Sequence, residues 1–167
     1  DFGVNRVSLG VETVNCKLQN ILERYTDKDK VLECVNNLKS NGITNINLDL
    51  IYAVEGETLE DLKKDLEFLL SLDVPHISTY SLIIEDNTKL KINGLKNIDK
   101  SLDREMYDFI SSILKDNSYI HYEISNFSKE GYYSIHNLKY WLNLNYYGFG
   151  VGASGYIDNI RYTNTRS

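Results

Sequence analysis

Two carboxylates stand on the polar faces of stretches that read as β-strands. In NINLDLIY, residues 45–52, apolar residues alternate with Asn45, Asn47 and Asp49, so one face of the expected strand is polar. The earlier stretch NRVSLGVE alternates in the same way and ends at Glu12. Buried carboxylates require partners, and ribose hydroxyls or an arginine would serve Asp49. We expect a ligand site at the C-terminal ends of these strands, although Glu12 alone is as simply explained by a solvated strand end.

A histidine among aromatic residues forms the second candidate site. The segment HNLKYW contains His136, Asn137, Tyr140 and Trp141, and a helix would bring His136 beside Tyr140. A neutral imidazole is a common axial heme ligand, and aromatic side chains can stack on a porphyrin face. The competing interpretation is a buried structural histidine with aromatic neighbours. The motif alone favours the structural interpretation.

Other residues with chemical potential give weaker signals. Cys16 and Cys34 lie 18 residues apart, which is no metal-ligand spacing, and we expect plain core or helix residues. His76 is expected to be structural or exposed. The glycine-rich segment GFGVGASGY lacks the Gly-Lys-Ser/Thr ending of a phosphate-binding loop. It is either a crowded loop that contacts a ligand or a plain turn.

The elements that position these residues read as a parallel α/β arrangement. Strands are expected at 6–12, 45–51 and 77–83, with helices in between, one of them capped by Thr58. Right-handed crossovers would make the three strands adjacent and parallel. Beyond a polar loop at 86–100 we expect a helix from residue 101 and a separate strand, IHYEIS, at 120–125.

Composition excludes several classes of function. The 167 residues carry a net charge of −6, which argues against a large nucleic-acid surface. No apolar run is long enough for a membrane span, and the two cysteines fit the reducing cytoplasm. The chain starts at Asp1 rather than Met, so we interpret it as a fragment of a longer protein.

Four stretches together resemble a known family. They are VSLGVETVNCKLQNILERYT, NINLDLIYAVEGETLEDLKKDL, HISTYSLIIEDNT, and YEISNFSKEGYYSIHNLKYW followed by YYGFGVGASGYI. They are similar to the oxygen-independent coproporphyrinogen III oxidase-like radical SAM proteins and, within these, to the HemW-type heme chaperones. The resemblance covers nearly the whole chain, and its YEISNF and HNxxYW elements are specific.

The resemblance implies an α/β fold, the C-terminal half of a partial (βα)6 TIM-like barrel followed by the start of an α+β C-terminal domain. Residues 1–90 would hold the last three βα units and residues 91–167 the start of the C-terminal domain. It also implies S-adenosylmethionine, heme and a 4Fe–4S cluster. The cluster ligands, a CxxxCxxC loop, would lie outside this chain, which alone is not expected to be active.

The resemblance also assigns site residues. Glu12, Arg24, Asp49 and the backbone at Ile83 match positions that surround S-adenosylmethionine in the family. His136, Asn137, Tyr140 and Trp141 would then line a heme site, with His136 as the possible iron ligand. The chain departs from the family pattern at several positions: Glu12 replaces Gln, Gly155 replaces a Ser or His-Ser pair, and Ala53, Glu55 and Glu57 replace the Gly, Pro and Gln of the loop GLPGQT.

Three functions remain open on the sequence. The first is a radical SAM heme chaperone that hands heme or porphyrin to an acceptor protein in the cytoplasm. The second is an oxygen-independent coproporphyrinogen III oxidase, which decarboxylates porphyrinogen propionates. The third is a non-catalytic or divergent radical SAM remnant, to which the loop departures point. Whether the parent protein is an enzyme is therefore undecided.

Overall fold

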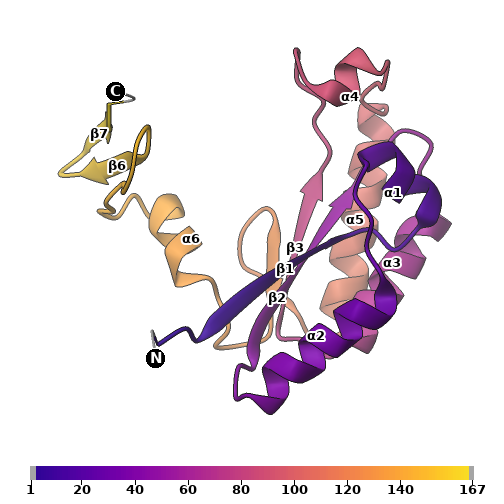
Figure 1. Cartoon of the computed structure of the whole chain (residues 1–167), viewed down its shortest axis with the longest axis horizontal. Coiled ribbons are helices and arrows are strands. Elements are labelled where there is room, and N and C mark those ends of the chain that lie inside the picture. The colour runs from indigo at the N-terminus through magenta and orange to yellow at the C-terminus, as the bar shows by residue number, and fades with distance from the viewer. Residues whose placement is uncertain (1–2, 166–167) are drawn as a thin grey trace. The chain divides into compact units, whose positions relative to one another are not determined.

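The computed structural model describes residues 3–165 of the chain. The chain divides into two compact units, which are separated between Tyr132 and Tyr133. The first unit holds β1 to β5 with α1 to α5, and the second holds α6, β6 and β7 (Figure 1). Each unit is described separately below.

The first unit is built on one five-stranded sheet in the order β1-β2-β3-β5-β4. The prediction of three adjacent parallel strands is confirmed, since β1 pairs with β2 and β2 with β3 in parallel. The third strand is two residues shorter than expected at its C-terminal end. The strands are β1 (Arg6–Glu12), β2 (Asn45–Tyr52), β3 (His76–Ser81), β4 (Ile120–His121) and β5 (Asn126–Ser128).

The helices begin where the sequence offers side chains that accept hydrogen bonds from free backbone N–H groups. Asn15, Asp27 and Thr58 cap α1, α2 and α3. Thr58 forms a full capping box, because Asp61 Oδ2 accepts from the Thr58 N–H at 3.1 Å while Thr58 Oγ1 accepts from the Asp61 N–H. The helices are α1 (Cys16–Leu22), α2 (Lys28–Ser40), α3 (Leu59–Ser71), α4 (Lys89–Ile92) and α5 (Lys100–Asp116).

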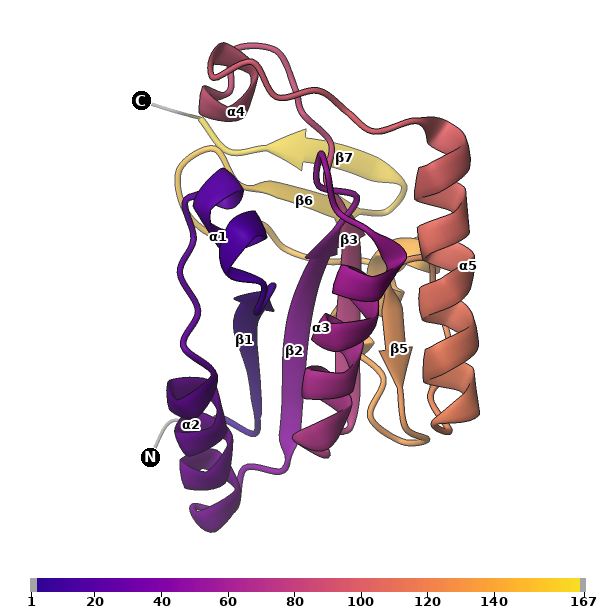
Figure 2. The same cartoon turned by 90° about the vertical axis from the view of Figure 1, so that its right-hand side faces the viewer.

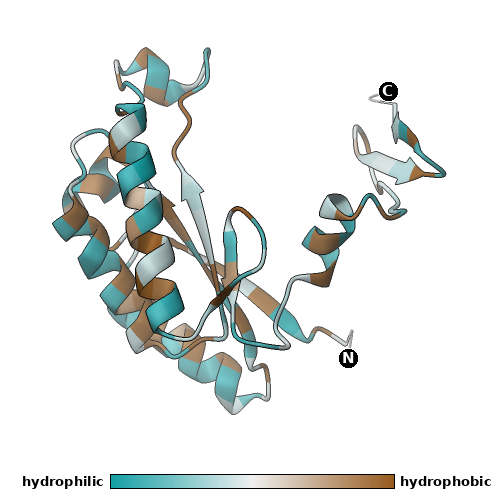
Figure 3. Ribbon diagram, turned by 180° about the vertical axis from the view of Figure 1, so that it is seen from behind, coloured by the Kyte–Doolittle hydropathy of each residue, from teal (hydrophilic) through white to brown (hydrophobic). Residues whose placement is uncertain are grey.

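The core lies between the sheet and the helices α2, α3 and α5, which cover one of its faces (Figure 2). Apolar and polar segments alternate along α3 and α5, as amphipathic packing requires (Figure 3). The alternating apolar residues of the strands face these helices and form part of the core. The polar residues of the same strands lie on the opposite face of the sheet. The fully buried residues on the helix-facing side include Ile46, Leu48, Leu50, Leu62, Leu66, Ile77, Met106, Ile110 and Phe127.

The segment 120–125 differs from the single strand that its sequence predicts. Residues 120–121 form β4, residues 122–125 turn, and residues 126–128 form β5. The turn is fixed by local polar groups, since Glu123 Oε2 accepts from the Ser125 N–H at 3.1 Å. Both strands continue the main sheet in antiparallel pairing, β5 beside β3. The alternating pattern of IHYEIS therefore predicted one continuous strand, whereas the chain reverses direction within this segment.

The second unit is a short helix and a hairpin. Ser134 caps α6 (Ile135–Trp141), and β6 (Ser154–Ile157) pairs with β7 (Ile160–Thr163) in antiparallel register. The predicted domain boundary near residue 90 falls within the first unit, where the loop 86–100 contains α4. It stays a prediction for the complete protein. None of the helices in the described residues 3–165 is long and apolar enough to cross a membrane.

Candidate functional site

Glu12 ends β1 in a strained conformation. Its φ of 63° is in the left-handed region, which is uncommon for residues other than glycine, and the strand register shifts between Gly10 and Glu12. The side chain is almost fully buried. Oε1 lies 2.5 Å from Nη1 of Arg24, while Oε2 has no hydrogen-bond partner in the described chain. Because Arg24 is 66% exposed, the pair contributes about 0–1 kcal/mol to stability.

The backbone around Glu12 is held in place by Asp65 of α3. This buried carboxylate accepts from Thr13 Oγ1 and from the Val14 N–H, each at 2.7 Å. Burial raises the pKa of Asp65, opposed by these two hydrogen bonds. Gln19 of α1 donates to the carbonyl of Thr13 at 3.0 Å. The surrounding contacts thus fix a conformation that the residue alone would avoid, a pattern that is found at functional sites.

Asp49 lies on the polar face of β2, half-buried. Its Oδ1 accepts from Nδ2 of Asn47 at 2.9 Å. Gly10 is its register partner on β1, and Glu12 Oε1 lies 3.6 Å from the point that a Cβ at Gly10 would occupy. Residues paired in this way project to the same face of a sheet. After the register shift Glu12 is paired with Leu50, but its Oε1 lies close to the Cβ position of Gly10, so its carboxylate reaches the face that carries Asp49.

This polar face continues across the sheet. His76 and Ser78 on β3 are the register partners of Asn47 and Asp49, and both contact the Asn47 side chain. Several buried atoms here lack hydrogen-bond partners within the described residues, which costs free energy. Polar groups of a ligand or of another segment could therefore form hydrogen bonds with this face of the sheet. These atoms are Arg6 Nε, Glu12 Oε2, Asn45 Oδ1, Asn126 Oδ1 and Ser128 Oγ.

Ile83 lies beyond the end of β3 and is 74% exposed. It lines a cavity of about 290 Å³ together with Tyr52, Tyr80 and Tyr107. The structure brings Glu12 and Arg24 into contact and sets Asp49 on the same face as Glu12. Within the described residues, no hydrogen bond joins Ile83 to those three. The assignment of Ile83 to a common site stays a prediction.

Three of the departures from the family pattern lie in the loop after β2. Ala53, which replaces glycine, has a φ of 66°, the conformation that glycine adopts without strain. Glu57, which replaces glutamine, is 4% exposed, and its Oε2 accepts from the Val54 N–H at 3.0 Å. Burial raises the pKa of Glu57 from 4.5 to about 8. At neutral pH the side chain is therefore mostly protonated and, like glutamine, neutral with a donor and an acceptor.

In the second unit, α6 presents the HNLKYW segment to solvent. His136 is exposed, so this unit by itself does not bury it, and the choice between a structural histidine and a heme ligand stays a prediction. Its Nε2 lies 2.9 Å from the Tyr140 hydroxyl, one helical turn away as predicted, and the rings meet edge to face. Tyr140 also packs against Tyr146, and Trp141 is 54% exposed. Asn137 is half-buried on the same helix.

The glycines of the second unit are explained by its own packing. A Cβ at Gly155 would lie 2.3 Å from the Tyr162 ring, and one at Gly148 would lie 2.6 Å from the backbone of Ser154. Such distances are too short for any side chain. The crowding therefore comes from neighbouring strands, which favours the turn interpretation of this segment over a contact with ligand.

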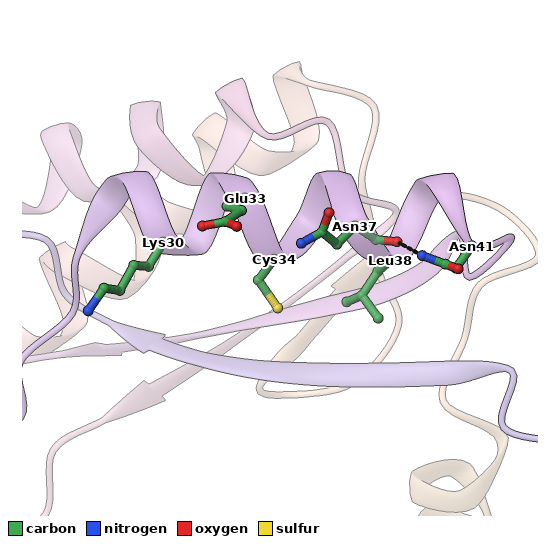
Figure 4. Close-up of a pocket in the computed structure, with 6 residues that line it drawn as sticks. All are labelled: Lys30, Glu33, Cys34, Asn37, Leu38 and Asn41. Atoms are coloured by element: carbon green, nitrogen blue, oxygen red, sulfur yellow. Dashed lines mark hydrogen bonds between the residues drawn. The ribbon is translucent and has the colours of Figure 1, made fainter.

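The cysteines lie away from the polar face. Cys16 is exposed and Cys34 half-buried, so both are helix residues but neither belongs to the core. Cys34 lines a hollow of about 460 Å³ along α2, where Cys34 and Leu38 point toward the neighbouring strand (Figure 4). This hollow contains none of the predicted site residues. Within residues 3–165, no cluster of His, Cys, Asp or Glu side chains could hold a metal ion.

Comparisons with known proteins agree with this arrangement. The Radical SAM superfamily model matches residues 1–69. The heme chaperone HemW of Lactococcus lactis is 46% identical over 98% of the chain, and that of Bacillus subtilis is 39% identical over 98%. The chain is therefore similar to radical SAM proteins over residues 1–69 and to these heme chaperones over nearly its whole length. It spans 44% of the length of each of these relatives.

A solved structure supports the fold of the chain. Coproporphyrinogen III oxidase (HemN) from Escherichia coli matches 99% of the chain with a TM-score of 0.83, and the chain covers 42% of that protein. At 18% identity the likeness shows the fold alone. The predicted radical SAM α/β fold is thereby confirmed.

Sequence reasoning missed the residues that surround Asp49. Asn47 was recognised as polar-facing but given no role. His76 was expected to be structural or exposed, and it is fully buried, which agrees with the structural interpretation. Tyr122, which contacts His76, was placed within a strand. Asn47 and His76 are register partners in the parallel pair of β2 and β3. The alternating patterns of both strands could therefore have indicated that these two side chains lie on the same face.

Proposed function

We propose that this chain is part of a radical SAM protein that binds heme and acts as a heme chaperone. The single observation that carries the proposal is an exposed histidine, His136, flanked by Tyr140 and Trp141 in a chain whose relatives bear the name heme chaperone HemW. A porphyrin needs an axial ligand that it can reach and flat aromatic neighbours. α6 offers both on one surface.

The chemistry of His136 allows ligation in two ways. If Tyr140 donates its hydroxyl proton to Nε2, then Nδ1 carries the ring proton, and the tyrosine must move for Nε2 to bind iron. If Nε2 donates to Tyr140, then Nδ1 keeps its lone pair for the iron. The second arrangement lets the tyrosine orient the ring while the other nitrogen binds. Asn137 and Trp141 complete the proposed pocket.

For S-adenosylmethionine we propose Glu12, Arg24, Asp49 and the backbone at Ile83. The residues fit the cofactor in two respects. Glu12 Oε2 is a buried acceptor that has no partner within residues 3–165, and Asp49 is a half-buried carboxylate. Carboxylates accept charge-assisted hydrogen bonds from ribose hydroxyls. The guanidinium of Arg24, largely exposed beyond its contact with Glu12, is suited to the methionyl carboxylate.

The remaining assignments concern the complete protein. We propose that its 4Fe–4S cluster is held by cysteines outside this chain. We also propose that residues 1–90 belong to the barrel and residues 91–167 to the C-terminal domain. We place the protein in the cytoplasm, where heme would pass to an acceptor protein whose identity is open.

The test is a heme titration of the full-length protein, followed by absorption spectroscopy. Wild type should bind heme with a Soret band that His136→Ala shifts and weakens, while the far-ultraviolet circular dichroism stays the same. Lys139→Ala, an exposed change on the same helix, is the matched control and should behave like wild type. An unchanged spectrum and affinity in His136→Ala would contradict the ligand role.

The alternative is a coproporphyrinogen III oxidase, which the fold likeness to HemN leaves open. There the cofactors would supply hydrogen abstraction from a propionate, and the protein would position the porphyrinogen. Incubation of the reconstituted protein with coproporphyrinogen III and S-adenosylmethionine separates the two. Formation of the decarboxylated product would favour the oxidase. Heme binding without turnover would favour the chaperone.

A further inference from the structure

Asn47 links three strands on the polar face of the sheet. Its Nδ2 donates to Asp49 Oδ1 at 2.9 Å and to Ser8 Oγ at 3.3 Å. Its Oδ1 accepts from Ser78 Oγ at 3.0 Å and lies 2.5 Å from His76 Nδ1. A side-chain amide offers two N–H groups and two lone pairs, so every hydrogen-bonding group of Asn47 is used. The amide is therefore fixed in one orientation.

That orientation follows from the charge of Asp49. An ionised carboxylate can only accept hydrogen bonds, so the Nδ2 side of Asn47 must face Asp49 and its Oδ1 must face His76. His76 Nδ1 therefore carries a proton. Burial, with a smaller effect from Arg6, lowers the pKa of His76 to about 3, so the ring is neutral at pH 7. Its Nε2 must then accept from the Tyr122 hydroxyl, 2.7 Å away.

Asp49 is thereby linked through Asn47 and His76 to Tyr122 by a chain of directional contacts. With the opposite tautomer of His76, the Asn47 amide would have to turn over and would present its oxygen to the carboxylate. Within the described residues, Asp49 Oδ1 is occupied by Asn47, and no hydrogen bond engages Oδ2. The carboxylate thus has a fixed plane and a free oxygen, which is what recognition of a sugar diol requires.

We propose that Asn47 and His76 are positioning residues that orient the Asp49 carboxylate toward the ribose hydroxyls of the adenosyl ligand. The inference rests on the proposed binding of S-adenosylmethionine at Asp49. It adds the residues that determine recognition of the sugar, none of which needs to touch the ligand. A network that merely satisfies buried polar groups would leave discrimination between ribose and deoxyribose unchanged.

The experiment measures that discrimination on the full-length protein with its reconstituted cluster. Calorimetry with S-adenosylhomocysteine and its 2′-deoxy analogue gives the ratio of the two affinities. In wild type the ribose form should bind about tenfold or more tightly, the scale of one hydrogen bond to a charged group. Asp49→Ala should reduce the ratio to about one.

Three variants test the positioning role. Asn47→Asp keeps the shape but replaces the donor to Asp49. Tyr122→Phe removes the hydroxyl that donates to Nε2 of His76 and so supports the tautomer with its proton on Nδ1. Both should lower the ratio to about threefold or less. Ser78→Ala is the matched control, because it removes a hydrogen bond from the same amide and leaves the Asn47–Asp49 contact intact. It should keep the wild-type ratio.

The outcomes separate the two levels of the proposal. Suppose that Asp49→Ala loses the preference for the ribose ligand but that Asn47→Asp and Tyr122→Phe both keep the wild-type affinity ratio. This result overturns the positioning role and keeps the ligand site. An unchanged ratio in Asp49→Ala overturns the ligand site and the inference with it. If Asn47→Asp does not fold, Tyr122→Phe decides, because phenylalanine can keep the edge contact that this ring makes with His76.

Discussion

Replacing Glu57 with glutamine should remove a pH dependence from the stability of the protein. Glu57 is buried, one oxygen accepts from the Val54 N–H, and Oε1 has no partner in the described chain. Its pKa is raised to about 8 from 4.5 because burial disfavours the charged form. Between these two values the folded chain keeps a proton that the unfolded chain releases.

The sign and size follow from this difference in bound protons. Stability from this group is fully present below pH 4.5 and is lost as pH rises through 8. The slope is about 1.4 kcal/mol per pH unit inside the window. From pH 5 to pH 8, wild type should lose roughly 3 kcal/mol through Glu57 alone. Glu57→Gln is neutral throughout and should not lose it.

Urea unfolding at a series of pH values, followed by circular dichroism, measures the effect. The variant and wild type should have similar stability at pH 5, and the variant should be more stable at pH 8. Glu67→Gln on α3 is the matched control, since that carboxylate is exposed and pairs weakly with Lys63. A stability difference between Glu57→Gln and wild type that stays constant from pH 5 to pH 8 would refute the reasoning.

Three further substitutions have defined outcomes. Asp49→Ala should weaken binding of S-adenosylmethionine by about 1–3 kcal/mol in calorimetry, and the iron content should stay the same. Thr58→Ala should lower the free energy of unfolding by about 1 kcal/mol, because it removes the capping box with Asp61; an unchanged urea midpoint would contradict this. Gly155→Ala should destabilise the second unit, since its Cβ would meet the Tyr162 ring at 2.3 Å, and equal thermal unfolding would count against that packing.

The sequence predicted the parallel strands and the helix starts because these depend on local signals. Alternation placed Asp49 on the polar face, and Asn15 and Thr58 marked helix N-termini that the structure has. The departures at Ala53 and Glu57 put the loop in doubt on sequence alone. Burial explains how Glu57 is accommodated, whereas the positive φ of Ala53 shows why glycine is preferred there, and neither quantity is readable from residue type.

The contacts around the candidate site were harder to predict because they join distant residues. His76 meets Asn47 across 29 positions, and Tyr122 reaches His76 across 46. Both contacts depend on strand register and on the turn at 122–125, which the alternating pattern concealed. Exposure of His136 likewise depends on how α6 packs within the second unit. For these reasons the motif alone favoured a structural histidine there, and the family resemblance was needed to favour heme.

The central claim is that His136 binds heme iron, and pulsed electron paramagnetic resonance of the ferric heme complex tests it most directly. In full-length protein with ¹⁵N-labelled histidine, the iron should show hyperfine coupling to a histidine nitrogen. His136→Ala should lose this coupling, whereas Lys139→Ala should keep it. A coupling that persists in His136→Ala, or that is absent from the wild-type complex, would contradict the assignment.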